Sequence, residues 1–136
     1  IFRIAGIYGP QRSIIDRMSS GNFINVINDN HFFSRIYIDD LVNVINASMN
    51  KPNPISIYNV ADDLPSSLND VVRYISEKTG IIIDREVQYS ELSKDEKRES
   101  FFTENKKINN KLIKEELGII LKFPTYIEGY NKIINC

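Results

Sequence analysis

The chain opens with an apolar stretch of β-forming residues that ends in a Gly-Pro turn, Arg3-Ile-Ala-Gly-Ile-Tyr-Gly-Pro10. A short apolar run bounded by turn residues is typical of a buried strand in a parallel sheet. Such a strand needs neighbours along its edges and helices on its faces. Only Ile1 and Phe2 precede the run. We therefore expect the opening strand to be part of a larger sheet, and the first residue, which is not Met, hints at a longer reading frame or a trimmed chain.

Length and composition predict a small domain. The 136 residues correspond to about one domain. The formal net charge is -1 and the two signs are interspersed, so we expect neither nucleic acid nor a membrane as a partner. The single cysteine, Cys136, cannot form an internal disulfide. No apolar segment approaches the roughly 18 residues of a membrane span. These features together favour a cytoplasmic location.

Apolar periodicity, caps and breakers predict a mixed α/β chain. Besides the opening strand, we predict strands at 23–28, 33–38, 55–60 and within 81–89, and helices at 13–20, from 39 to before Pro52, at 67–80, at 110–117 and from 125 onward. The opening strand and 55–60 can form a right-handed β-crossover-β unit. Residues 90–100 are expected to be solvated.

Two helices have the clearest sequence signals. Ser67 followed by Asp70, and Thr125 followed by Glu128, are spaced as capping boxes. The helix from 39 is expected to bury Leu41, Val44, Ile45 and Met49, and the last helix Ile127, Tyr130, Ile133 and Ile134.

The only histidine, His31, lies in a turn-like stretch, where we expect it to be exposed or to act as a cap. It has no Cys, His or carboxylate partners at ligand spacing, so no metal site is predicted. Ser13, Ser66 and Ser67 lie near predicted helix starts, where capping is their expected role.

Five short motifs, in order, resemble the extended short-chain dehydrogenase/reductases, which include NAD-dependent epimerases and dehydratases. They are Arg3–Pro10, Phe33-Ser-Arg-Ile-Tyr-Ile-Asp-Asp40, Ile57-Tyr-Asn-Val-Ala-Asp-Asp63, Glu116-Leu-Gly118 and Pro124-Thr-Tyr-Ile-Glu-Gly129. The run Phe102-Thr-Glu-Asn-Lys-Lys-Ile-Asn109 is similar to the atypical branch of nucleoside-diphosphate-sugar epimerase-like proteins. The resemblance implies the C-terminal part of a Rossmann-like α/β fold, as a single domain over 1–136. Residues 1–60 would form outer parallel strands and a crossover, and 61–136 mostly a small substrate-binding lobe.

Two motifs that could indicate a complete dehydrogenase do not fit. Gly6-Ile-Tyr-Gly9 resembles the start of a dinucleotide fingerprint, but Pro10 and Arg12 occupy places where that loop needs small residues. Tyr74 and Lys78 have the spacing of the family's catalytic pair, in which the cation lowers the pKa of the phenol. In the family this pair precedes the strand that ends in Tyr-Gly-Pro, whereas here it follows it. We therefore predict no catalytic residue in this chain.

The resemblance also implies site residues. Ala5, Gly6 and Ile7 would border the nicotinamide, with Gly6 allowing a planar ring to approach the backbone. Tyr8 and Arg12 would line the substrate cleft, although a solvated Arg12 after a simple turn is an equal alternative. Sugar-nucleotide epimerases have an arginine for the substrate diphosphate at the position of Phe33, which leaves Arg35 as the candidate anion contact. Asp40 is expected to cap its helix and Asn59 to fix a turn.

These expectations lead to two main hypotheses and a weaker third. In the first, the chain is the substrate-binding part of an NAD(P)-dependent epimerase/dehydratase acting on a sugar-like substrate. It would not be competent alone, binding NAD or NADP only when a nucleotide-binding N-terminal half completes it. In the second, it is a non-catalytic remnant or binding module that self-associates through an exposed strand edge. An unrelated α/β interaction domain is the third.

Overall fold

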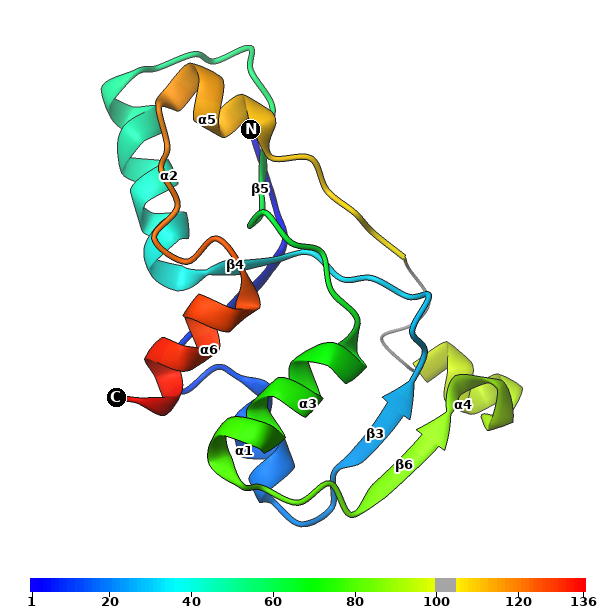
Figure 1. Ribbon diagram of the computed structural model, residues 1–136. Coiled ribbons are helices and arrows are strands. Elements are labelled where there is room, and N and C mark those ends of the chain that lie inside the picture. The colour runs from blue at the N-terminus through cyan, green and yellow to red at the C-terminus, as the bar shows by residue number, and fades with distance from the viewer. Residues whose placement is uncertain (100–104) are drawn as a thin grey trace. The chain divides into compact units, whose positions relative to one another are not determined.

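The computed structural model describes residues 1–99 and 105–136 (Figure 1). Its elements are β1 (Phe2–Ile4), β2 (Gly6–Tyr8), α1 (Ile14–Ser19), β3 (Ile24–Ile27), β4 (Arg35–Tyr37), α2 (Ile38–Asn50), β5 (Tyr58–Val60), α3 (Leu68–Thr79), β6 (Arg85–Gln88), a 3-10 turn (Tyr89–Glu91), α4 (Lys94–Glu99), α5 (Lys111–Leu117) and α6 (Tyr126–Ile134). The motif residues Phe102, Thr103 and Glu104 lie outside the described residues. The mixed α/β class predicted from the sequence is confirmed.

The described chain divides into two compact units. Unit 1 comprises residues 1–12, 34–65 and 108–136, and unit 2 comprises residues 13–33 and 66–107. Every strand pair in the described chain is parallel. Each unit is considered by itself below.

In unit 1, the opening run is two short strands with different partners, not one strand. β1 pairs with β5, with Phe2 opposite Tyr58, and β2 pairs with β4, with Gly6 opposite Arg35. The change occurs at Ala5, whose N–H donates to the carbonyl of Val60, whereas the N–H of the next residue donates to the carbonyl of Ser34. The parallel pairing of β1 with β5 agrees with the predicted pairing of the opening strand with residues 55–60.

The core of unit 1 lies between these strands and the helices α2 and α5. Its buried members are Ile36, Leu41, Val44, Tyr58, Val60, Ile113 and Leu117. In Figure 1, α5 lies beside α2 and next to β5, in agreement with their contacts. Of the α2 residues that were predicted to be buried, Leu41 and Val44 are buried, but Met49 is 65% exposed.

Asp40 does not cap α2, contrary to the prediction. It lies in the first turn of that helix and is 1% exposed. Its Oδ1 accepts from the N–H of Lys122 and its Oδ2 from the N–H of Phe123, each at 2.9 Å. One carboxylate therefore fixes the segment that leads into α6. That helix begins with the predicted capping box of Thr125 and Glu128.

The buried face of α6 differs in part from the prediction. Tyr130 is buried, but Ile127 is 42% exposed. Gly129 is buried instead, since its Cα faces the ring of Tyr8. The helix thus contacts β2 through a glycine and an aromatic side chain.

In unit 2, β3 and β6 form a parallel pair and α3 packs on β3. Ser67 caps α3 by accepting from the N–H of Asp70, and Gly80 ends it with φ 76°, as the sequence predicted. Ser13 likewise caps α1. His31, expected to be exposed or capping, is instead 7% exposed, with its ring 5.0 Å from that of Phe33. Residues 94–99, expected only to be solvated, form the helix α4.

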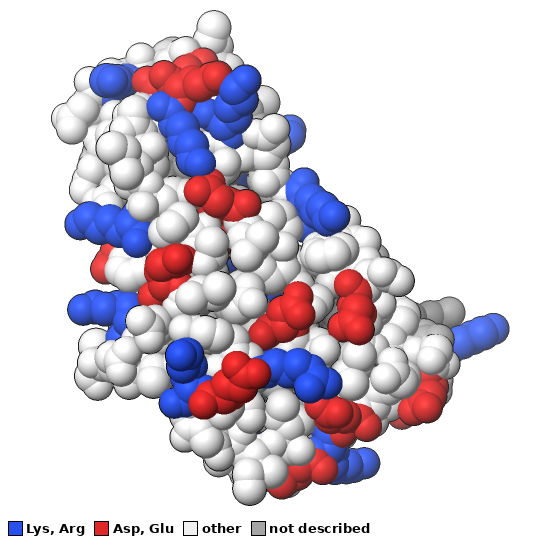
Figure 2. All heavy atoms as spheres, in the orientation of Figure 1, with Lys and Arg blue, Asp and Glu red and all other residues white. Residues whose placement is uncertain are grey.

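Among the described residues, no helix has the length and apolar character to cross a membrane. Charged side chains of both signs are intermixed over the face shown in Figure 2. This surface agrees with the interspersed charges of the sequence.

Candidate functional site

Polar side chains of unit 1 gather around Arg35, the half-buried first residue of β4. Tyr8 is the last residue of β2, and Asp62 follows β5 by two positions. The N–H of Asp62 donates to the carbonyl of Arg35 on β4, at 2.6 Å. Tyr130, from α6, stacks on Tyr8 with ring centroids 5.0 Å apart. We call Tyr8, Arg35, Asp62 and Tyr130 the Arg35 cluster. Ligands of open α/β sheets bind at the carboxyl ends of strands, where Tyr8 and Asp62 lie.

The electrostatics of the Arg35 cluster are those of a partly dehydrated site. Burial lowers the pKa of Arg35, while Tyr130 and Asp62 act in the opposite direction. Burial, with the charge of Asp62 as the next cause, raises the pKa of Tyr8 well above its usual value, so its hydroxyl stays neutral. A guanidinium that has lost hydration in this way interacts strongly with an anionic group. The contact of Arg35 with a carboxylate or a phosphate stays a prediction.

Asp62 is the least satisfied member of the Arg35 cluster. Its side chain is buried, with the residue 2% exposed. Oδ1 accepts from the N–H of Leu64 at 3.2 Å, whereas Oδ2 accepts no hydrogen bond from the described part of the chain. Burial raises the pKa of this carboxyl to about 7. Near neutral pH, Asp62 can thus hold a proton beside Arg35.

The raised pKa of Asp62 makes stability depend on pH. The carboxyl ionises near 3.8 in an unfolded chain and at about 7 in the folded one, so the folded state binds more protons between these values. We expect the contribution of Asp62 to the free energy of unfolding to be fully present below pH 4 and to be lost as pH rises through 7. Urea denaturation at pH 4 to 8 measures it. Asp62→Asn should flatten this part of the profile, whereas Asp39→Asn, at an exposed position, should leave it unchanged; equal profiles for Asp62→Asn and the wild type would contradict the prediction.

The predicted substrate contacts lie in different surroundings. Tyr8 and Arg35 come together in the Arg35 cluster, where Tyr8 is 5% exposed and also meets Tyr37 edge-on at 5.4 Å. Arg12 is exposed, and its Nε donates to the carbonyl of Ile7 at 3.2 Å. The turn before it is closed by Gly9 and Arg12, with Gln11 at φ 62°. The substrate role of all three residues stays a prediction.

Ala5, Gly6 and Ile7 form the junction of β1 and β2. Gly6 is exposed, and a Cβ built on it would meet only the Ser34 carbonyl, at an ordinary 3.5 Å. The absence of a side chain here is therefore not required by packing. It leaves bare backbone that a planar ring could contact. The role of Ala5, Gly6 and Ile7 beside a cofactor also stays a prediction.

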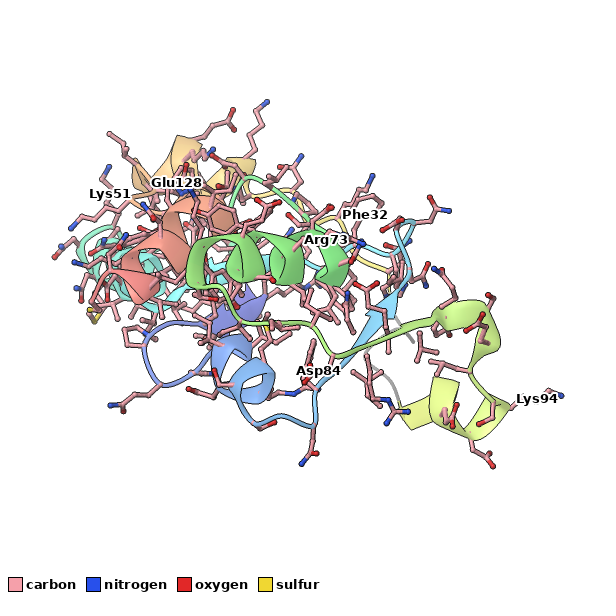
Figure 3. All side chains as sticks on the ribbon, turned by 60° about the horizontal axis from the view of Figure 1, so that its bottom comes forward. Phe32, Lys51, Arg73, Asp84, Lys94 and Glu128 are labelled. Atoms are coloured by element: carbon pink, nitrogen blue, oxygen red, sulfur yellow. The ribbon has the colours of Figure 1, made fainter. Side chains whose placement is uncertain are left out.

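Unit 2 contains a second polar cluster, which ties β3, α3 and β6 together. Asn25, at 0% exposure, donates through Nδ2 to Oδ1 of Asn69 at 3.0 Å and to Oε1 of Glu86 at 3.4 Å. Arg73, labelled on α3 in Figure 3, donates through Nε to the same Oδ1 at 3.2 Å. These bonds explain how a polar face packs inside unit 2. The described residues contain no group of three metal-ligating side chains.

The sequence analysis assigned no role to Asp62 or Tyr130 in a site. The signal for Asp62 was its place just after a predicted strand, in Asn59-Val-Ala-Asp62. For Tyr130, the apolar periodicity of the last helix indicated only a core residue. Neither pattern indicates that the two side chains meet at Arg35.

Comparison with solved structures supplies relatives of the fold. A functionally unknown conserved protein from Silicibacter pomeroyi is 39% identical, with a TM-score of 0.87 over 97% of this chain and 47% of its own. A dTDP-glucose 4,6-dehydratase from Bacillus anthracis, solved with NAD, is 16% identical, with a TM-score of 0.76 over 98% of this chain and 42% of its own. A UDP-glucose 4-epimerase from Thermotoga maritima, solved with UDP-glucose, is 19% identical. Its TM-score is 0.72, over 98% of this chain and 44% of its own.

The chain thus spans less than half the length of each of these three proteins. Comparison with protein-family models and with curated proteins found no match. The structural neighbours agree with the resemblance drawn from the motifs. The chain has the fold that part of each of these NAD-dependent epimerase and dehydratase structures adopts.

Proposed function

We propose that this chain is the substrate-binding part of an NAD(P)-dependent epimerase/dehydratase-like protein and needs a nucleotide-binding half for activity. The observation that carries the proposal is the second edge of β1. The N–H of Tyr58 donates to the carbonyl of Ile1, and the N–H of Ala5 donates to the carbonyl of Val60. In a parallel pair, the peptide groups of Phe2 and Ile4 then point to the opposite edge. Within the described residues, β1 has β5 as its single neighbour.

The Arg35 cluster supplies the substrate contacts in this proposal. Arg35 binds an acidic group of a sugar-like substrate, and the buried Asp62 favours the charged form of Arg35. Tyr8, neutral because its pKa is raised, presents a hydroxyl that now lies 3.4 Å from the carbonyl of Thr125. No group in the chain is assigned to proton transfer with the substrate.

The residues at the junction of β1 and β2 fit one wall of a cofactor site. Gly6 offers exposed backbone to a flat ring, and Ala5 and Ile7 flank it. A nicotinamide cofactor, when bound, would supply hydride transfer. The chain lacks a glycine-rich phosphate loop, so most of the cradle must come from the other half.

The test is reconstitution with the portion of the Silicibacter pomeroyi protein that has no counterpart in this chain. We expect calorimetric titration with NADH or NADPH to show no binding to this chain alone and clear binding to the complex. Gly6→Val should weaken the cofactor about tenfold, because one steric clash costs on the order of 1.4 kcal/mol. Lys132→Ala, exposed on α6, is the control.

Two outcomes would overturn the proposal. Tight cofactor binding by the chain alone would contradict its dependence on another half. A complex that forms but binds no cofactor would contradict the assigned role. The same open edge of β1 also favours the alternative of a non-catalytic module that pairs with a second copy. A dimeric mass of the chain alone, unchanged by the added portion, would support that alternative.

A further inference from the structure

We propose that the Arg35 cluster binds an anionic ligand together with a proton, and that Asp62 is the group that takes up the proton. This inference rests on the proposed function, in which Arg35 contacts an acidic group of a sugar-like substrate, and it adds a regulation of that contact. Arg35 is half-buried, so a ligand can reach it, whereas Asp62 is 2% exposed. Asp62 therefore acts on the ligand through Arg35.

Backbone hydrogen bonds hold Asp62 next to Arg35. The N–H of Asp62 donates to the carbonyl of Arg35 at 2.6 Å, just after the chain leaves β5. The N–H of the following residue, Asp63, donates to the carbonyl of Pro124 at 2.8 Å. The main chain is thus fixed on both sides of the Asp62 carboxyl, which stays close to the start of β4.

The hydrogen bonding of the Asp62 carboxyl favours its neutral form. Oδ1 accepts from the N–H of Leu64 at 3.2 Å, and the buried Oδ2 accepts no hydrogen bond from the described part of the chain. A buried carboxylate with so few donors is costly, whereas a protonated carboxyl loses much less on burial. Burial accordingly raises the pKa of this carboxyl to about 7. Asp62 can therefore exchange a proton near neutral pH.

Other charged and titratable groups also act on Asp62 or on Arg35. They are Tyr8, Asp40, Asp63, Tyr126 and Tyr130. The two other carboxylates each have two donors: the N–H groups of residues 122 and 123 for Asp40, and the side chains of residues 110 and 114 for Asp63. Asp62 has one donor among the described residues. We therefore assign the proton to Asp62.

An anion on Arg35 and a proton on Asp62 favour each other. The anion adds a negative charge near the carboxyl, and it offsets the positive charge of Arg35 that favours the ionised carboxyl. Both effects raise the pKa of Asp62 in the bound state. By reciprocity, the ligand binds more tightly when Asp62 is protonated. The affinity should therefore be constant below about pH 6 and fall as pH rises through 7.

The experiment titrates the chain with glucuronate, a sugar carboxylate that is ionised above about pH 5. The Cζ signal of Arg35 in the ¹³C-labelled chain reports binding, at constant ionic strength. We expect a Kd about tenfold weaker at pH 8.5 than at pH 5.5, which corresponds to a rise of about one unit in the pKa of Asp62. Asp39→Asn, at an exposed position, should keep this pH dependence.

Asp62→Asn distinguishes the proton from a packing role. This isosteric, uncharged variant should bind glucuronate at pH 8.5 about tenfold more tightly than the wild type, with a Kd that no longer depends on pH. A loss of packing would weaken binding instead. The Cγ signal of Asp62 in the wild type needs no variant, and it should show the pKa rising by about one unit when glucuronate is added.

The outcomes separate this inference from the proposed function. A Kd that is equal at both pH values, with an unchanged pKa of Asp62, would overturn the inference while leaving the proposed function intact. An Arg35 signal that glucuronate does not move at either pH would overturn the inference together with the proposed substrate contact. Cofactor binding by the reconstituted complex tests the rest of the proposed function independently.

Discussion

Asp40→Ala should lower the free energy of unfolding by about 3–4 kcal/mol, because it leaves two backbone donors without their charged acceptor. Those donors are the N–H groups of Lys122 and Phe123, each 2.9 Å from a carboxylate oxygen. Phe123 also stacks on Tyr37, with ring centroids 4.0 Å apart. Losing the carboxylate therefore loosens the turn that positions this ring. Urea denaturation followed by circular dichroism measures the change.

Asp39→Ala is the matched control for Asp40. Both residues lie in the first turn of α2, but Asp39 is exposed. Its removal should cost about 0.5 kcal/mol, through the lost interaction with the helix dipole. Asp40→Asn keeps one acceptor oxygen, so its free energy of unfolding should lie between those of Asp40→Ala and Asp39→Ala. If Asp40→Ala and Asp39→Ala were equally stable, the carboxylate would not be what holds residues 122 and 123.

Gly129→Ala should destabilise the chain by about 2–3 kcal/mol, in spite of the better helix propensity of alanine. A Cβ at this position would clash with Oη of Tyr8 and would lie 2.6 Å from Cζ. Tyr8 cannot retreat easily, because Tyr130 and Tyr37 contact its ring. The overpacking exceeds the gain of about 1 kcal/mol that alanine brings to a helix interior.

A double-mutant cycle separates the clash at Gly129 from the loss of a flexible residue. Tyr8→Ala removes the ring, so adding Gly129→Ala to it should cost nothing or stabilise slightly. Lys132→Ala, exposed on α6, should leave the urea midpoint nearly unchanged. If Gly129→Ala were equally costly with and without the ring of Tyr8, the contact would not be its cause.

Local signals predicted the helices well because caps act within a few residues. Ser67 and Gly80 bound α3, and Thr125 and Glu128 start α6, where the sequence placed them. The split of the opening strand was missed because both halves look equally apolar. Only the partners, Val60 for Ala5 and Ser34 for Gly6, distinguish them. Met49 satisfies the same periodicity as the core residues, yet it lies outside the core of unit 1.

The candidate site was predictable only in part. The sequence singled out Tyr8 and Arg35 through their motifs. It did not indicate that Asp62 is buried beside them, because a carboxylate after a strand is usually solvated. The role of Asp40 was misassigned for a similar reason. An acidic residue in the first turn of a helix suggests a cap, whereas its partners, Lys122 and Phe123, lie far along the chain.

The interleaved order of the two units constrains how the chain can fold during synthesis. Unit 1 takes its residues from the start, the middle and the end of the sequence. Ile113 and Leu117, near the end, share a core with Ile36. The core of unit 1 therefore stays incomplete until residues 113 and 117 have left the ribosome. Contacts so distant in sequence slow folding, and waiting apolar strands are prone to aggregate. Chaperones that shield nascent strands would raise the yield of this chain more than that of one whose units are contiguous.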